Sequence, residues 1–274
     1  LTYIQFLNNI LYYNYLFNMF INNFDPVAIQ IFSLEIRWYS LSYIFGIILG
    51  WIYCKKIIKD KNISILFDDL ISYLILGIII GGRLGYILFY NPNYYLNNLI
   101  EIPMIWKGGM SFHGGLIGVI VTTIIFSKKN NINKYIFLDL ISASAPIGIF
   151  LGRVSNFLNS ELYGRETDVP WSVIFLKIDN LSRHPSQLYE AILEGIFLFI
   201  IFLLFIKKNY LSRPGLISSI FLILYSLLRF FVEFYRAPDE QIGFLLFNIT
   251  MGQFISLIFF SFGLYLYSKK KNEK

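Results

Sequence analysis

Long apolar stretches recur along the chain, separated by short segments rich in polar and basic residues. A helix needs about 20 residues to cross the hydrocarbon core of a membrane, which is about 30 Å thick. The pattern predicts seven such spans, which leave room for one small extramembrane element and for no second domain. The spans run over residues 39–54, 70–90, 111–127, 136–152, 187–206, 215–232 and 249–267.

Composition agrees with a membrane protein and excludes a soluble domain. Of the 274 residues, 56% are hydrophobic and only 15% are charged, and the mean hydropathy is +0.60. The net charge of +6 comes mainly from lysines at the ends of the spans. This is the positive-inside pattern of membrane proteins rather than a nucleic-acid-binding surface, so we expect no nucleic-acid partner.

The lysine clusters set the predicted topology. They follow the first, third, fifth and seventh spans, so these span ends are expected to face the cytoplasm. The amino terminus and the loops 91–110, 153–186 and 233–248 then face the opposite side. The clusters are Lys55–Lys61, Lys128–Lys134, Lys207–Lys208 and Lys269–Lys274.

The chain is predicted to form a single seven-span membrane domain over residues 25–270. Residues 1–24 are assigned to an N-terminal extension, because they are apolar but rich in asparagine and lack the basic region and cleavage site of a signal peptide. Met19 begins a more ordinary amino-terminal sequence. Part of residues 1–18 is therefore expected to derive from upstream translation or to form an added interfacial segment.

Most arginines, unlike the lysines, lie inside or just beyond the apolar stretches. A guanidinium near hydrocarbon costs about 3 kcal/mol even on a lenient insertion scale, so it usually marks function. With a helical rise of about 1.5 Å per residue, five ionisable groups from five spans fall about 20 Å above the cytoplasmic edge. We expect a layer in which arginines outnumber carboxylates, which favours an anionic ligand such as a phospholipid phosphate. The five groups are Arg83, His113, Arg153, Glu194 and Arg229.

Structural interpretations compete with the functional ones. Arg229 and Glu233 lie four residues apart, as do Glu190 and Glu194, so ion pairs that only hold the bundle together would give the same pattern. For His184 the structural interpretation is favoured, because Pro185 behind it marks a helix start. Cys54 is expected to be a small apolar helix residue, and a single cysteine excludes an internal disulfide.

His113 stands in the glycine-rich run Gly108–Gly115. The apolar residues that follow it, 114–126, are too few to cross a membrane alone. The run is therefore expected to dip into the membrane and to line a cavity. In that place a catalytic or ligand-positioning role for His113 competes evenly with a structural one.

Several segments together closely resemble the bacterial phosphatidylglycerol–prolipoprotein diacylglyceryl transferases, from Asp25-Pro26 to Gly252-Gln253. The resemblance implies an all-α polytopic protein of the bacterial inner membrane, with about seven transmembrane helices and a small periplasmic head element. Its N-terminus would be periplasmic and its C-terminus cytoplasmic. The segments are Arg37–Tyr39, Gly81–Tyr86, Gly108–Gly115, Gly152–Arg165, His184–Glu190 and Arg229–Arg236.

The resemblance also implies an activity. Such an enzyme moves the diacylglyceryl group of phosphatidylglycerol onto the lipobox cysteine of a prolipoprotein signal peptide, forming a thioether and releasing glycerol phosphate. The family's functional residues fall on Tyr39, His113, Arg153, Asn156, Glu161, Gly164, Arg229 and Glu233. To these we add Arg83, from its glycine-rich motif, and Tyr225, which shares a helix face with Arg229 and Glu233.

The chain departs from the family pattern at a few positions. Ser155 and Ser160 stand where the signature usually has glycines, and Ser226 replaces another glycine beside Tyr225. The stretch Trp171–Ser182 is short, which indicates a trimmed head. These departures concern local backbone shape and substrate range more than the reaction.

A mechanism follows as a hypothesis. Arg153 and Arg229 would bind the phosphate, because a leaving phosphate needs fixed positive donors. Asn156 and Tyr39 would orient the headgroup. His113 would take the thiol proton, since a free thiol with a pKa of about 8.5 is mostly protonated near neutrality. The glutamates Glu161 and Glu233 would hold the arginines.

No cofactor is expected, because the two histidines lack the spacing of metal ligands. The alternative functions are a transporter or binder of anionic phospholipid without covalent chemistry, and a phospholipid headgroup hydrolase. A transporter would favour internal repeats. The only repeat is short, Gly82–Gly85 against Gly152–Ser155.

Overall fold

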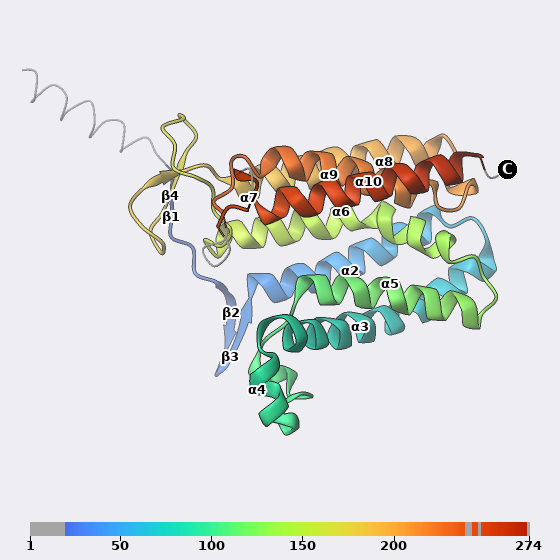
Figure 1. Cartoon of the computed structure of the whole chain (residues 1–274), viewed down its shortest axis with the longest axis horizontal. Helices are drawn as coiled ribbons and strands as arrows, with labels where there is room; N and C mark the ends of the chain where they lie inside the picture. Colours follow the sequence, from blue (N-terminus) through green and yellow to red (C-terminus); the bar gives the residue numbers. More distant parts are fainter. Residues whose placement is uncertain (1–19, 239–242, 246–247, 273–274) are drawn as a thin grey trace, which may run out of the picture.

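The computed structural model describes residues 20–238, 243–245 and 248–272, so the predictions for residues 1–18 and Met19 lie outside the described part. Seven long helical segments run side by side along the molecule (Figure 1), and each overlaps one predicted apolar stretch. They are α2 (Trp38–Ile57), α3 (Lys61–Tyr90), α5 (Phe112–Lys129), α6 (Lys134–Leu158), a composite helix of α7 (Ser186–Glu190), η3 (Ala191–Phe197) and α8 (Leu198–Lys207), then α9 (Leu216–Val232) and α10 (Met251–Asn272).

Five of these segments are long and apolar enough to cross a membrane: α2, α3, α6, the composite helix from Ser186 to Lys207, and α10. The other two, α5 and α9, have 18 and 17 residues and lie among them. The fold is therefore that of a helical multi-pass membrane protein.

Polar side chains at the breaks between apolar stretches cap the helices. An oxygen of Asp60 accepts hydrogen bonds from the backbone N–H groups of Asn62 and Ile63 at the start of α3. Ser111 and Asn133 act in the same way at the starts of α5 and α6. Such caps satisfy N–H groups that have no partner inside the helix, which is why these helices begin where they do.

The lysine-rich connections lie together at one end of the bundle, the end that carries the C-terminus (Figure 1). The Lys59 ammonium donates to the side-chain oxygen of Asn209 at 3.0 Å, which joins the α2–α3 and α8–α9 connections. The Lys270 ammonium lies 4.1 Å from the ring centre of Tyr135, which joins the end of α10 to the start of α6. This common placement is what the positive-inside pattern predicts.

Glycines bring α3 and α5 into backbone contact. A Cβ atom on Gly81 would collide with the carbonyl oxygen of Gly114, and one on Gly114 would collide with that of Gly81. A Cβ on Gly77 would lie 2.9 Å from the Gly118 carbonyl oxygen. Small residues at such contacts are a common way for helices to pack in a membrane. The glycines of the Gly81–Tyr86 motif therefore serve helix packing.

The end opposite the lysines carries small β-structure (Figure 1), which the all-α prediction did not include. Residues 20–24, assigned from the sequence to an extension, belong to this head. The strands escaped prediction because they are short, and because the first of them pairs with a segment far along the chain. β1 (Phe20–Asn22) pairs in parallel with β4 (Val173–Phe175), β4 pairs with β5 (Ser182–Arg183), and β2 (Val27–Ile31) and β3 (Leu34–Arg37) form a hairpin.

Cys54 lies in the apolar core between α2, α3 and α6. It is fully buried beside Phe67 and Leu70, and its thiol donates to the carbonyl oxygen of Leu140 at 3.3 Å. The prediction of a small core residue in a helix is confirmed.

Candidate active site

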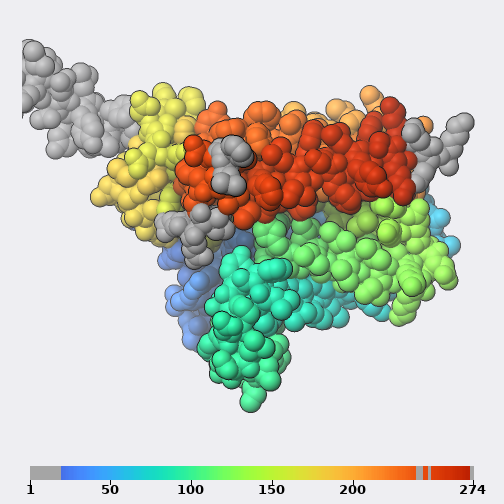
Figure 2. Space-filling view, in the orientation of Figure 1, coloured from blue at the N-terminus to red at the C-terminus, as the bar shows by residue number. Residues whose placement is uncertain are grey.

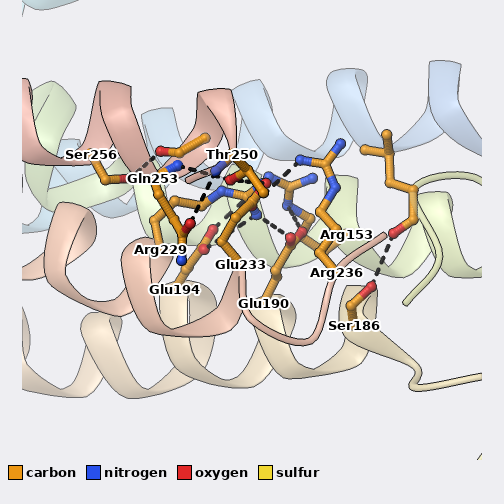
Figure 3. Close-up of polar contacts among 12 residues, drawn as sticks. Arg153, Ser186, Glu190, Glu194, Arg229, Glu233, Arg236, Thr250, Gln253 and Ser256 are labelled. Atoms are coloured by element: carbon orange, nitrogen blue, oxygen red, sulfur yellow. Dashed lines mark hydrogen bonds and ion pairs between the residues drawn. The ribbon is translucent and has the colours of Figure 1, made fainter. Parts of the chain in front are cut away.

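Three arginines and three glutamates meet at the head end of the bundle, where α6, the composite helix and α9 converge (Figure 3). Arg153 comes from α6, Glu190 and Glu194 from the composite helix, and Arg229 from α9, which Glu233 and Arg236 follow directly. We call these six residues the arginine–glutamate cluster.

Glu190 joins two arginines with one carboxylate. Its Oε2 lies 2.7 Å from the Nε of Arg153, and its Oε1 pairs with the Nη1 of Arg229. Glu190 is fully buried, so these pairs form away from water. The carboxylate therefore couples the end of α6 to the end of α9.

Arg229 is held by carboxylates on both of its terminal nitrogens. Nη1 also lies 3.7 Å from an oxygen of Glu194, and Nη2 lies 2.6 Å from an oxygen of Glu233. The side chain of Arg229 is 9% exposed. Its guanidinium is thus fixed in position by three glutamates.

Arg153 is held less completely. Its Nη1 lies 3.4 Å from the side-chain oxygen of Asn156, and its Nη2 lies 4.0 Å from Glu194. Its side chain is 18% exposed. In the described part of the chain, the terminal nitrogens of Arg153 therefore retain donors for an anionic ligand, while Nε is anchored to Glu190.

Glu194 lies in a π-helical turn, η3, which interrupts the composite helix. Such turns occur frequently at functional sites. Gly195 allows this turn to approach α6, since a Cβ atom there would lie 2.7 Å from the Cβ of Phe150. Glu194 is fully buried, and among the described residues neither of its oxygens has a hydrogen-bond partner. It faces Arg153 and Arg229 only through the longer ion pairs.

The cluster is balanced in charge, with three arginines and three glutamates. The prediction that arginines outnumber carboxylates at this depth is therefore wrong for this site. It counted Arg83 and His113, which lie elsewhere, and it left out Glu190 and Glu233. The charge balance is expected, because burying an arginine without a carboxylate partner would greatly destabilise the fold.

Glu233 has a partner just before α10 that the sequence analysis missed. Thr250 donates from its hydroxyl to Oε1 of Glu233 at 3.1 Å, and Gln253 accepts from the Thr250 N–H at 3.1 Å. A Cβ atom on Gly252 would lie 2.6 Å from the same glutamate oxygen, so only glycine leaves room for the carboxylate there. The region that resembles the family ends at Gly252-Gln253, and this was the only sequence feature that pointed to the contact.

Among the described residues Glu161 pairs with no arginine, contrary to the hypothesis. Its oxygens accept from the side-chain amides of Asn156 at 3.2 Å and Asn159 at 3.4 Å. Its backbone carbonyl accepts from Gln187 at 2.7 Å. Because Asn156 also approaches Arg153, the turn after α6 links Glu161 to the cluster through Asn156.

Comparisons with known proteins identify the family. The family model described as prolipoprotein diacylglyceryl transferase matches residues 26–268. The chain belongs to this family. Curated relatives named phosphatidylglycerol–prolipoprotein diacylglyceryl transferase include one from Nitrobacter hamburgensis, which is 47% identical over 243 residues, 85% of this chain and 84% of the relative. Those of Rickettsia bellii and Rickettsia typhi are 47% and 48% identical over 251 and 252 residues, 90% of this chain and 95% and 97% of theirs.

The serines that depart from the transferase pattern are buried. The Ser155 hydroxyl donates to the Trp38 carbonyl oxygen at 3.2 Å, which ties the start of α2 to the end of α6. Ser160 donates to the side chain of Asn22 at 3.2 Å. In the described part, the Ser226 hydroxyl has no hydrogen-bond partner.

Tyr39 and Tyr225, both predicted site residues, lie on different helices, α2 and α9. Tyr39 follows Trp38 at the start of α2, is partly exposed, and accepts from the hydroxyl of Tyr43 at 3.3 Å. Tyr225 lies one turn before Arg229 on α9.

Gly164 ties the Gly152–Arg165 signature to the segment after Glu233. Its N–H donates to the His184 carbonyl oxygen at 3.0 Å, and it forms a β-bridge with Arg236. A Cβ atom there would collide with the His184 carbonyl and lie 2.8 Å from that of Tyr235. Gly164 therefore joins these two segments through the backbone.

Arg83 serves the loop before α5 rather than the cluster. It donates to four carbonyl oxygens, among them those of Glu101 at 2.7 Å and Ile102 at 2.8 Å, and it stacks over Tyr95. These bonds hold the side arm formed by α4 (Pro92–Asn97), η1 (Leu99–Glu101) and η2 (Ile105–Lys107), which projects from the bundle (Figure 2).

His113 lies in the first turn of α5 with an exposed side chain. Its ring packs edge-on against Phe112. Among the described residues no hydrogen bond or ion pair joins it to the cluster, so the expected layer separates into a cluster and two outlying groups, Arg83 and His113.

His184 and Arg183 belong to the head. His184 contacts the hydroxyl of Tyr189 at 3.1 Å and packs on Tyr235, and burial lowers the pKa of its imidazole. Arg183 pairs with Asp179 at 2.5 Å and holds the pKa of that carboxyl below its usual range. This geometry supports the structural interpretation of His184.

Proposed function

We propose that this chain transfers the diacylglyceryl group from phosphatidylglycerol to the thiol of the lipobox cysteine in a prolipoprotein signal peptide. The observation that carries the proposal is the arginine–glutamate cluster, in which Arg153 is anchored at Nε and keeps terminal donors for an anion. Family membership gives the reaction class, and the cluster supports the place where it occurs.

Arg153 binds the phosphate of the lipid in this proposal. A guanidinium presents its terminal N–H groups in a planar fork that matches two phosphate oxygens. As the bond to the glyceryl carbon breaks, charge gathers on the leaving phosphate. Fixed donors aimed at that charge lower the barrier because they need not reorganise during the reaction.

Arg229 has a different role in the proposed reaction. Its terminal nitrogens are occupied by Glu190, Glu194 and Glu233, so it mainly fixes Glu190, and Glu190 in turn fixes Arg153. Its positive charge, on a side chain that is 9% exposed, also stabilises the phosphate. Arg229 is therefore a positioning residue with an electrostatic contribution.

The reaction joins sulfur to carbon and breaks a carbon–oxygen bond. The cysteine sulfur attacks the glyceryl carbon, and glycerol phosphate leaves with the bonding electrons. His113, an exposed imidazole at the start of α5, takes the thiol proton. Asn156 and Tyr39, beside the open side of Arg153 and at the start of α2, orient the headgroup.

The proposed topology has seven transmembrane helices in a bacterial inner membrane. The lysine-rich end of the bundle faces the cytoplasm, together with the C-terminus. The head, with its strands and the arginine–glutamate cluster, faces the periplasm, where signal peptides emerge. α5 and α9 complete the seven spans as shorter members of the bundle.

Mass spectrometry of a lipobox peptide tests the proposal. The peptide is incubated with phosphatidylglycerol and membranes that contain the chain, with Arg153→Ala membranes as the control. A diacylglyceryl mass gain on the cysteine in the first sample alone supports the proposal. No gain, with the protein folded and phosphatidylglycerol bound, would favour a lipid binder or transporter, and glycerol or glycerol phosphate released without peptide would favour a hydrolase.

A further inference from the structure

Asn22 crosses from the head sheet to the end of α6. Its side chain is fully buried. Its Nδ2 donates to the carbonyl oxygen of Phe157 at 2.7 Å, and its Oδ1 accepts from the hydroxyl of Ser160 at 3.2 Å. These partners lie 135 and 138 positions away in the sequence. Asn22 therefore holds the short turn at Phe157–Ser160 through two long-range hydrogen bonds.

The strand that carries Asn22 is itself fixed. β1 pairs in parallel with β4, and the Leu176 N–H donates to the Asn22 carbonyl oxygen at 3.2 Å. The ring of Phe20 stacks on that of Phe157, 6.1 Å between centres. Asn22 thus reaches the α6 turn from a position set by backbone pairing.

Ser160 needs this partner for two reasons. Its φ of +60° lies in the left-handed region, which residues other than glycine, asparagine and aspartate rarely adopt. It is also 1% exposed, so its hydroxyl has no access to water and depends on an acceptor in the protein. The hydrogen bond to Asn22 offsets both costs.

The turn that Asn22 holds separates two residues of the proposed site. It runs from Asn156 to Glu161 and is closed by the hydrogen bonds of three backbone N–H groups, those of Asn159, Ser160 and Glu161, at 2.9, 3.1 and 2.9 Å. The Phe157 carbonyl accepts from both Ser160 and Asn22. A shift of this turn would move Glu161 from Asn156, and Asn156 from Arg153.

We infer that Asn22 is a positioning residue for the transfer reaction and that it acts through Ser160. The inference rests on the proposed function for its activity readout. Asn22 keeps Ser160 in the left-handed conformation, and this conformation sets the distance between Asn156 and Glu161. Substrate phosphate binds mainly at Arg153, whose anchor Glu190 lies on another helix, so loss of Asn22 lowers kcat more than it raises KM.

A double-mutant cycle tests this inference. Asn22→Ala, Ser160→Gly and the double variant are purified as full chains, with Asn23→Ala as a matched control at the exposed residue directly after the strand. Transfer to a lipobox peptide from micelles of phosphatidylglycerol gives kcat and KM. Hydrogen exchange of the amides of residues 157–161 gives a readout that needs no activity.

Asn22→Ala is expected to lower kcat about tenfold, with KM for the lipid changed less than about twofold. In the Ser160→Gly background the same substitution is expected to cost less than about threefold, because glycine adopts φ +60° without strain and has no hydroxyl to satisfy. Exchange of the 157–161 amides should rise in Asn22→Ala and return toward the parent level in the double variant.

Two results would overturn the inference. One is equal kcat for Asn22→Ala and Asn23→Ala. The other is a loss in Asn22→Ala that Ser160→Gly does not relieve, which would mean that Asn22 only fills the core. If the parent chain transfers no lipid, the proposed function fails, and hydrogen exchange alone then decides the coupling of Asn22 to Ser160.

Discussion

Nε of Arg153 lies 2.7 Å from Glu190, whose other oxygen pairs with Arg229. The two arginines thus share a carboxylate but differ in how far their terminal guanidinium nitrogens are occupied by carboxylates. Arg229 has carboxylates at both terminal nitrogens, whereas in the part of the chain that the structure describes the terminal nitrogens of Arg153 have only longer contacts. Substitutions that keep the positive charge should therefore separate ligand binding at Arg153 from the support that Arg229 provides.

Arg153→Lys is expected to lower kcat/KM by about 10²–10³-fold, because a single ammonium cannot replace a fork of donors aimed at a developing phosphate charge. The thermal unfolding midpoint in detergent should change little, since Glu190 keeps its pair with Arg229. Steady-state transfer to a lipobox peptide gives the activity. Activity near that of the parent would contradict phosphate binding through the planar guanidinium of Arg153.

Arg229→Lys should affect stability as well as activity. One ammonium cannot reach Glu190, Glu194 and Glu233 together, so buried carboxylates lose their partner, which costs about 3 kcal/mol. We expect a lower unfolding midpoint than in Arg153→Lys, together with a loss of transfer. Equal midpoints for the two variants would show that Arg229 does not hold the cluster.

Glu190→Gln and Glu161→Gln form a second matched pair. Removing the charge of Glu190 leaves Arg153 and Arg229 without their shared partner, at a cost of about 3 kcal/mol in the free energy of unfolding. Glu161 is exposed, and within the described ranges its carboxylate accepts only from side-chain amides, so the same change there should cost less than about 1 kcal/mol. Chemical denaturation in detergent measures both, and a similar cost at both sites would refute the shared-carboxylate arrangement.

The sequence predicted what depends on local signals. Each apolar stretch is helical, caps such as Asp60 mark where helices begin, and the lysines gather at one end. These features follow from hydrophobicity, helix propensity and charge within a short window. The arginines also stood out, because a guanidinium in an apolar stretch is rare.

Packing between distant segments could not be predicted in the same way. The strand β1 has three residues, and its partner β4 lies far along the chain. The π-helical turn at Glu194 has the same apolar pattern as an α-helix, so periodicity does not reveal it. The bridge at Glu190 depends on how α6 and α9 approach each other. The predicted excess of arginines over carboxylates was therefore wrong, although each residue of the cluster had been noted in the sequence.

Gly164→Ala is expected to abolish most transfer by displacing backbone rather than by removing a contact. The added Cβ would collide with the His184 carbonyl and break the bridge between Gly164 and Arg236. Gly152→Ala, just before Arg153, is the control, since nothing lies within 4 Å of a Cβ there. It should be neutral or stabilise the chain by up to about 1 kcal/mol, because alanine favours helix over glycine. Transfer assays and unfolding midpoints of both variants test this prediction. Full activity in Gly164→Ala would contradict the need for glycine at this backbone contact.

The head should lose stability as the pH falls. Burial lowers the pKa of His184, so the folded chain binds fewer protons there than the unfolded chain, in which the pKa is about 6.5. Its contribution to stability is then present above about pH 6.5 and is lost as the pH falls through the folded-state pKa. Unfolding midpoints at about pH 7.5 and about pH 5.5 should differ more in the parent than in His184→Gln. The same difference in both would remove His184 as the cause.

His113→Gln tests the proposed base. The side chain is exposed and has no hydrogen bond among the described residues, so the variant should fold like the parent. Transfer should slow by about 10²-fold near neutral pH, a typical contribution of general base catalysis. The deficit should shrink as the pH rises toward about 8.5, because the thiol of the peptide then ionises without help. Phe112→Leu, which alters the ring packed on His113, serves as the control and should keep the parent's pH–rate profile. An unchanged profile in His113→Gln would remove His113 as the base and leave proton transfer to another group.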